Sequence, residues 1–163
     1  MPGVLDVVAH PVNNGTTIVV QIDKVNEGHA KWVAMALWAS GAALYRYKYV
    51  IVVDDDVDPS DYAAVDWAVN YRVRPGSDDI VVLPGTFGSP IDPSTPPELR
   101  SVADLGAGLW NRMLIDATRT WRYAPQEKWG GARFPPTVHP APEDLERVRT
   151  RWDEYRFTEW ETA

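Results

Sequence analysis

The sequence predicts an α/β protein, a single domain in which helices flank a mixed β-sheet. The β-branched run Val50–Val53 is typical of a strand buried on both faces. Strand-like and helix-like segments follow one another along the chain, which is typical of an α/β protein. The 163 residues are enough to bury one core.

The chain begins with two short apolar runs, Val4–His10 and Thr16–Ile22, separated by Asn14-Gly15. Asn-Gly is a strong turn signal, so these runs predict a β-hairpin. Asn26 is a candidate cap for a helix over His29–Ser40, which Gly41 ends. The buried stripe expected on this helix is Ala30, Val33, Ala34, Leu37 and Trp38.

The central strand Val50–Val53 ends in an acidic turn, defined here as Asp54–Asp58. Pro59 ends the strand because it lacks an N–H donor, and it suits the first turn of a helix. A helix is expected over Asp61–Arg72, with Asp58 or Ser60 as N-cap and Asp61 adding negative charge to the positive end of its dipole. Its apolar stripe would be Ala64, Trp67, Ala68 and Tyr71.

Ile80–Leu83 predicts another strand, followed by a long loop, Pro84–Pro97, rich in Pro, Gly and Ser. Ordered loops of this length are uncommon and often functional. Arg112–Ile115 predicts one more short strand. The α/β domain is therefore assigned to residues 1–118.

Residues 119–163 have a different composition. Aromatic side chains are spread through a Pro- and Gly-rich arm, and an amphipathic helix is expected over Pro142–Phe157. Its apolar stripe is Leu145, Val148, Trp152 and Tyr155. A helix of this length is marginal alone in water. We therefore expect it to dock on another subunit, which predicts an oligomer.

The formal charge of −7 argues against nucleic acid or an anionic membrane as partner, since both require a basic surface. The chain has no cysteine, which excludes disulfides and cysteine-bound metals and fits a cytoplasmic location. Val4–Ala9 is too short for a signal peptide, and no segment is long enough to span a membrane.

The acidic turn is the one cluster that suggests a metal. A calcium loop is excluded because Pro59 and Val65 stand where that loop needs Gly and Glu. Asp-x-Asp after a strand also suggests haloacid-dehalogenase phosphatases or metal-dependent nucleotide-sugar transferases, whereas the simpler interpretation is a solvated turn that caps a helix. The three histidines, His10, His29 and His139, do not cluster, and no phosphate loop or nucleophile elbow is present. The residues alone predict neither a metal site nor a self-sufficient active site.

Several motifs together resemble the C-terminal domain of the UbiD family of decarboxylases. The family pattern is a strand, Asp-(Asp/Glu)-Asp-Ile-Asp, then a helix with Trp-Ala that ends Thr-Arg-x-x-Pro. Here these are Asp54–Asp58, Trp67-Ala68 and Tyr71–Pro75. Gly28–Lys31 matches the family's Gly-His-Ala-Lys, and Ile115–Thr118 matches its Ile-Asp-Ala-Thr. The resemblance covers nearly the whole chain in the same order.

The resemblance implies a function that depends on a partner. Family members are reversible decarboxylases of aromatic and α,β-unsaturated acids. Their prenylated flavin mononucleotide, with its divalent metal and monovalent cation, and their catalytic arginine and two glutamates belong to a larger upstream domain. The chain would then be the small subunit of a split enzyme, inactive alone, whose large subunit holds the flavin.

The resemblance also implies which residues shape the pocket. The family's loop over the substrate reads Gly88-Ser89-Pro90-Ile91 here, with Ser89 in place of a bulky aromatic, which leaves room for a larger or more polar substrate. Tyr45 falls where fungal members place a pocket tyrosine. The lysine that contacts the flavin phosphate is replaced by Ala42, so Arg46 or Lys48 is expected to substitute.

We therefore expect a small UbiD-type subunit that shapes the substrate pocket and the oligomer, with the acidic turn chiefly architectural. Two alternatives remain. One is a non-catalytic scaffold or regulatory module of the same fold, and the other is an Asp-x-Asp metal-dependent transferase.

Overall fold

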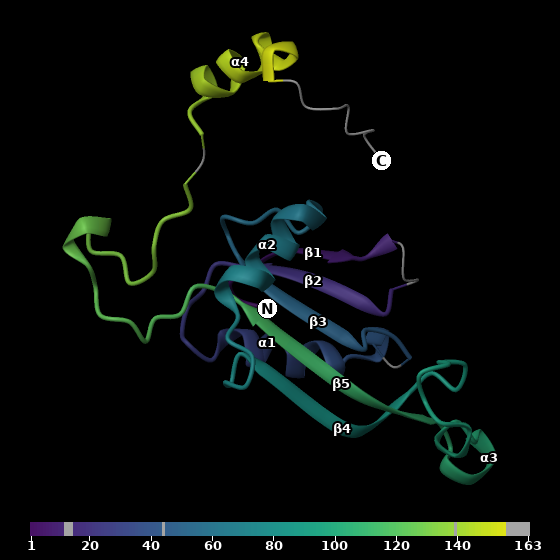
Figure 1. Cartoon of the computed structure of the whole chain (residues 1–163). Coiled ribbons are helices and arrows are strands. Elements are labelled where there is room, and N and C mark those ends of the chain that lie inside the picture. The colour runs from purple at the N-terminus through teal and green to yellow at the C-terminus, as the bar shows by residue number, and fades with distance from the viewer. Residues whose placement is uncertain (12–14, 44, 139, 156–163) are drawn as a thin grey trace. The chain divides into compact units, whose positions relative to one another are not determined.

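A five-stranded mixed sheet forms the centre of the protein (Figure 1). The computed structural model describes residues 1–11, 15–43, 45–138 and 140–155.

The strand order in the sheet is β1-β2-β3-β5-β4. The strands are β1 (Val4–Ala9), β2 (Thr17–Ile22), β3 (Tyr49–Asp54), β4 (Ile80–Gly88) and β5 (Gly108–Ala117). The three central strands β2, β3 and β5 run parallel, and the edge strands β1 and β4 are antiparallel to their neighbours. This confirms the mixed sheet and the hairpin, although residues 12–14 of its turn lie outside the described residues.

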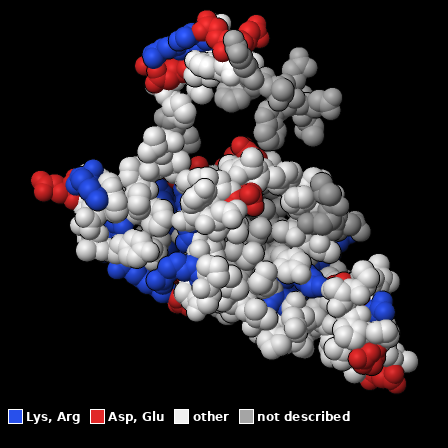
Figure 2. Space-filling view, in the orientation of Figure 1, with Lys and Arg blue, Asp and Glu red and all other residues white. Residues whose placement is uncertain are grey.

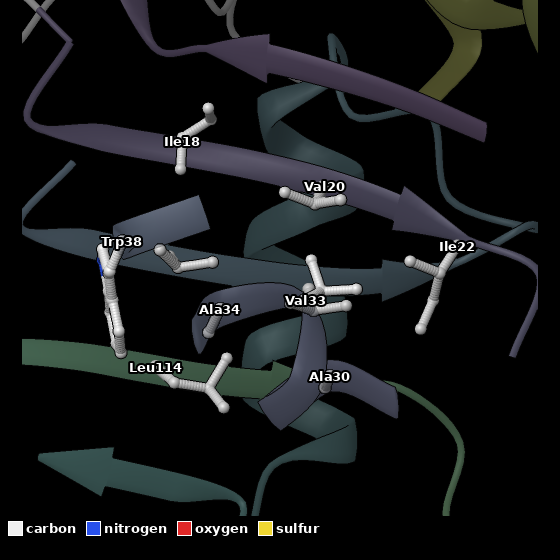
Figure 3. Close-up of a cluster of buried hydrophobic side chains, with 10 residues drawn as sticks. Ile18, Val20, Ile22, Ala30, Val33, Ala34, Trp38 and Leu114 are labelled. Atoms are coloured by element: carbon white, nitrogen blue, oxygen red, sulfur yellow. The ribbon is translucent and has the colours of Figure 1, made fainter. Parts of the chain in front are cut away.

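Helices α1 (His29–Trp38) and α2 (Tyr62–Arg72) cover opposite faces of this sheet. Successive side chains of a strand point to opposite faces. Val20 accordingly packs with the α1 cluster, whereas Val19 packs with the α2 cluster. Figure 3 shows Ile18, Val20 and Ile22 of β2 facing the buried side chains of α1. The expected stripe of α1 is confirmed, with Leu37 only partly buried.

The predictions for α2 were wrong in two details. The N-cap is Asp61, whose Oδ1 accepts hydrogen bonds from the backbone N–H groups of Ala63 and Ala64 at 3.0 and 3.1 Å. Asp58 instead accepts from Ser60 in the preceding turn. Tyr71 is 72% exposed, because the buried face is turned towards Val65, Ala68 and Arg72.

The edge pair β4–β5 is longer than predicted. The strand predicted over Ile80–Leu83 continues through Pro84 and Gly85 to Gly88, and β5 starts at Gly108 rather than Arg112. The register shifts between Leu83, which pairs with Arg112, and Thr86, which pairs with Trp110, so that Pro84 and Gly85 stand opposite the single residue Asn111. An edge strand tolerates proline at such a bulge because one side of the strand has no ladder bonds to lose.

The chain divides into two compact units, Met1–Ala124 and Pro125–Ala163. The first unit also contains the short helix α3 (Val102–Leu105). The second contains α4 (Pro142–Thr150), followed by a 3₁₀ turn at Trp152–Tyr155. The helix expected over Pro142–Phe157 is therefore shorter, and Phe157 lies outside the described residues.

Large uncharged areas separate small groups of charged side chains on the face shown in Figure 2. None of the helices in the described part of the chain is long and apolar enough to cross a membrane.

Candidate functional site

The carboxyl end of the sheet, where α/β proteins usually bind ligands, is filled by ion pairs. The acidic turn follows β3, and Asp54 is only 2% exposed. Arg72 of α2 lies 3.4 Å from Asp54 and 2.7 Å from Asp56. Arg119, just after β5, donates to Asp54 from its backbone N–H at 2.6 Å and from Nε at 3.0 Å. Two arginines thus pair with the Asp54 and Asp56 carboxylates of the turn.

The carboxyl groups of the turn respond differently to this environment. Burial raises the pKa of Asp54 above its ordinary value, against the opposing hydrogen bonds and charge of Arg119. Burial acts in the same direction on Asp56, but the hydrogen bond and charge of Arg72 prevail and lower its pKa. In the described part of the chain, no three His, Cys, Asp or Glu side chains form a group that could hold a metal.

Two further carboxylates, Glu27 and Asp78, hold the chain as it leaves β5. Glu27 accepts hydrogen bonds from Thr120 at 2.8 Å and from the backbone of Trp121 at 2.9 Å. Arg122 donates two hydrogen bonds of 2.6 Å to Asp78. These contacts lie within the first compact unit, Met1–Ala124.

His29 is also structural. It is fully buried at the start of α1, and its Nδ1 accepts a hydrogen bond from the backbone N–H of Val25 at 3.3 Å. Its Nε2 lies 3.2 Å from the Pro2 carbonyl, so the ring joins the N-terminus to α1. His10 stacks on Tyr62, and His139 lies outside the described residues.

The opposite, amino end of the parallel strands holds a cavity of about 450 Å³. Thr16, Tyr49 and Trp110 line it from the starts of β2, β3 and β5. The loop after β4 closes another side. The full lining is Gly15, Thr16, Tyr45, Arg46, Lys48, Tyr49, Ser89, Ile91, Asp92, Pro93, Ser94 and Trp110.

The structure brings the predicted site residues together in this cavity, except for Pro90, which does not line it. Tyr45 and Arg46 come from the segment before β3, and Ser89 and Ile91 from the loop after β4. Tyr45 is 51% and Ile91 83% exposed, so this side of the cavity is open to solvent.

Lys48 is held within the cavity wall. Its Nζ lies 2.8 Å from Asp92 Oδ2 and also donates to Ser94. Burial opposes ionisation of Asp92, but the hydrogen bond from Lys48 outweighs it and lowers the pKa. The loop after β4 is thus fixed to the segment before β3 by an ion pair that is largely shielded from solvent.

Three residues of the cavity region carried no recognisable sequence signal as site residues. Trp110 is buried against Gly88, where an added Cβ would overlap the indole ring. Arg112 is 1% exposed beneath the same wall. Asp92 lies in the loop expected to be functional. The position of Arg112 among apolar residues of a strand is unusual for a basic residue, but this pattern alone does not indicate a binding site.

The comparisons with known proteins identify the family. The model of the 3-octaprenyl-4-hydroxybenzoate carboxy-lyase C-terminal domain matches residues 1–117. An uncharacterized protein of Aeropyrum pernix is 34% identical over 93% of this chain and 28% of its own length.

Solved structures agree with this. Vanillic acid decarboxylase of Sedimentibacter hydroxybenzoicus in closed form is 29% identical, with a TM-score of 0.69 over 96% of this chain and 30% of that chain. The UbiD-class enzyme HmfF of Pelotomaculum thermopropionicum, in complex with FMN, is 27% identical, with a TM-score of 0.68. The match covers 91% of this chain and 29% of the HmfF chain. The chain thus spans less than a third of the length of these relatives. It belongs to the family of UbiD-class carboxy-lyase C-terminal domains.

Proposed function

We propose that this chain is the small subunit of a UbiD-type reversible decarboxylase of aromatic or α,β-unsaturated acids, and that it forms one wall of the substrate pocket. The observation that carries this proposal is the cavity, in which Tyr45, Ser89 and Ile91 lie together. A cavity of this size and mixed lining is suited to a small organic acid. In the relatives, more than two thirds of the chain lies outside the matched region. A partner large subunit would supply that part here.

The partner would hold the prenylated flavin with its divalent metal and monovalent cation. HmfF, whose structure contains FMN, supports a flavin for this family. Arg46 is the better candidate in this chain to reach the flavin phosphate, because its side chain is exposed. Lys48 is the weaker candidate, because its ammonium group already pairs with Asp92. Two cations at the cavity fit a phosphate or a carboxylate.

The C-terminal helix would complete the assembly by docking on another chain. In α4 and the turn after it, Leu145, Val148 and Trp152 are 42%, 40% and 49% exposed. Charged side chains also lie on this helix, among them the Asp144–Arg147 pair, 2.7 Å apart. An apolar stripe of this kind is typical of a helix that binds in a groove of a partner.

Expressed alone, the chain is expected to be colourless and inactive, because by resemblance the flavin and the catalytic residues belong to the partner. Co-expression with a flavin-domain partner from the same genome should give a larger assembly with flavin absorbance and decarboxylation of aromatic acids. Light scattering, absorbance and product formation measure the three properties. A flavin band nearly stoichiometric with the chain expressed alone would overturn the proposal. An assembly that holds flavin without turnover would favour the scaffold alternative.

Residues 89 and 91 are expected to select substrates by size. Ser89→Phe should narrow the range towards smaller acids and Ile91→Ala should widen it, by about tenfold in relative kcat/KM, since one methylene is worth about 1–3 kcal/mol. The measurement is kcat/KM over acids of graded size, with the partner present. Val138→Ala is the control, because Val138 is 88% exposed and does not line the cavity. An unchanged rank order in both variants would remove the loop from the pocket.

A further inference from the structure

Arg112 is a buried arginine between the two walls of the cavity. It lies on β5 opposite Leu83 of β4, and it is 1% exposed. Arginine is almost never buried to this extent without partners for its donors. Burial lowers its pKa, but a guanidinium remains charged in a protein. Its hydrogen bonds are therefore essential to the wall that contains it.

The hydrogen bonds of Arg112 join two segments far apart in the sequence. Nη1 donates to the carbonyls of Arg46 and Tyr47 at 2.9 and 3.2 Å. Nη2 donates to the carbonyls of Ala43 at 3.3 Å and Phe87 at 3.1 Å. Nε donates to Thr86 Oγ1 at 3.1 Å. One segment is thus residues 43–47, and the other is the end of β4.

Both segments continue directly into the cavity lining. Residues 43–47 contain Tyr45 and Arg46, and β4 leads into Ser89 and Ile91. The guanidinium also lies 5.4 Å from the centre of the Phe87 ring and 5.7 Å from that of Trp110. The guanidinium thus joins the two cavity walls from beneath, in addition to the Lys48–Asp92 ion pair that joins them at the cavity.

The first segment is also strained. Tyr47 has φ = 58°, a conformation that is costly for a bulky residue and is kept only where surrounding contacts hold it. Its carbonyl accepts from Trp38 Nε1 at 2.8 Å as well as from Arg112, and its N–H donates to the Gly15 carbonyl at 3.1 Å. Removing Arg112 takes away one of the contacts that maintain this conformation.

We propose that Arg112 is a positioning residue that sets the spacing between residues 43–47 and 86–91, and through it the substrate range of the pocket. The proposal rests on the proposed function for its second half, since it takes the cavity as the substrate pocket. Lysine cannot replace Arg112, because three donors on one nitrogen cannot reach both segments as the five donors of a planar guanidinium do.

Hydrogen exchange of the full chain tests the first half without any partner. In Arg112→Lys, amide exchange is expected to become faster in both residues 43–47 and 86–91. Arg72→Lys is the matched control, because Arg72 is an equally buried arginine at the opposite end of the sheet. That variant should accelerate exchange around the acidic turn and leave these two segments unchanged. Acceleration of only one segment in Arg112→Lys, or of both in Arg72→Lys, would overturn the coupling.

Steady-state kinetics of the assembly with its flavin partner tests the second half. Arg112→Lys is expected to raise KM by about tenfold or more and to change the rank order of acids of graded size, while kcat falls less than about threefold. Arg72→Lys should keep the wild-type KM and rank order.

If Arg112→Lys fails to fold, a second variant tests the same role. Thr86→Val removes one acceptor of Arg112 and should shift KM in the same direction by a smaller factor. Unchanged KM and rank order would overturn the role in substrate choice, whereas absence of activity in the wild-type assembly would overturn the proposed function itself.

Discussion

Replacement of Arg72 by alanine is expected to lower the free energy of unfolding by about 3–5 kcal/mol, the usual cost of removing one partner of a buried ion pair. The Arg72 and Asp54 side chains are only 1% and 3% exposed. Without Arg72, Asp54 keeps Arg119 as a partner, and Asp56 loses both of its short bonds, of 3.0 and 2.7 Å. The loss should therefore lie near 3 kcal/mol. Urea unfolding monitored by tryptophan fluorescence measures it.

Arg74→Ala is the matched control for this experiment. Arg74 stands two residues further along, its side chain is 60% exposed, and its Nε lies 3.9 Å from Asp79. An exposed pair of this kind contributes about 0–1 kcal/mol. If Arg72→Ala and Arg74→Ala cost the same, the acidic turn is not held by buried ion pairs. The architectural interpretation of the turn would then be wrong.

Features governed by local sequence were predictable. The β-branched run Val50–Val53 correctly predicted the central strand, and the two apolar runs near the start of the chain correctly predicted the antiparallel pair β1–β2, because both signals act over a few neighbouring residues. The motifs at Gly28–Lys31 and Asp54–Asp58 correctly indicated the family. What the sequence could not show is that Asp54, in one of these motifs, and Glu27, just before the other, hold the chain where it leaves β5.

Features that depend on distant partners were missed. The strand predicted over Ile80–Leu83 continues past Pro84 to Gly88, because proline is tolerated on an edge strand, and the sequence does not show which strand lies at the edge. Arg119 pairs with Asp54 across 65 positions of sequence. No local pattern reports such a pairing. The same holds for Arg112, whose partners lie 25 to 69 positions away.

The position of the cavity was predictable only through the family resemblance. The general rule for α/β sheets favours the carboxyl ends of the strands, where ion pairs fill the space in this protein. The cavity lies instead at the amino ends, where Thr16 directly precedes β2 and Tyr49 begins β3. Its apolar wall depends on a close approach between Gly88 and Trp110, which neither residue reveals by itself.

Gly88→Ala is expected to cost about 2–3 kcal/mol of stability, towards the upper end of what overpacking a well-filled site costs. A Cβ at residue 88 would overlap the Trp110 ring, and Trp110 is 2% exposed, so little free space is available to it. Arg112 lies 5.7 Å from the centre of that ring, and Lys48 lies 6.0 Å from it. The indole cannot move without disturbing the cavity wall.

Gly41→Ala is the control, because nothing lies within 4 Å of a Cβ added there. It should be neutral or slightly stabilising, by about 0.4–1 kcal/mol, since alanine restricts the unfolded chain more than glycine does. The measurements are chemical unfolding of both variants and near-ultraviolet circular dichroism, which reports the packing of the tryptophans. Equal stability of the two variants, with unchanged near-ultraviolet spectra, would mean that Trp110 can leave Gly88 freely. The rigid apolar wall inferred for the cavity would then not exist.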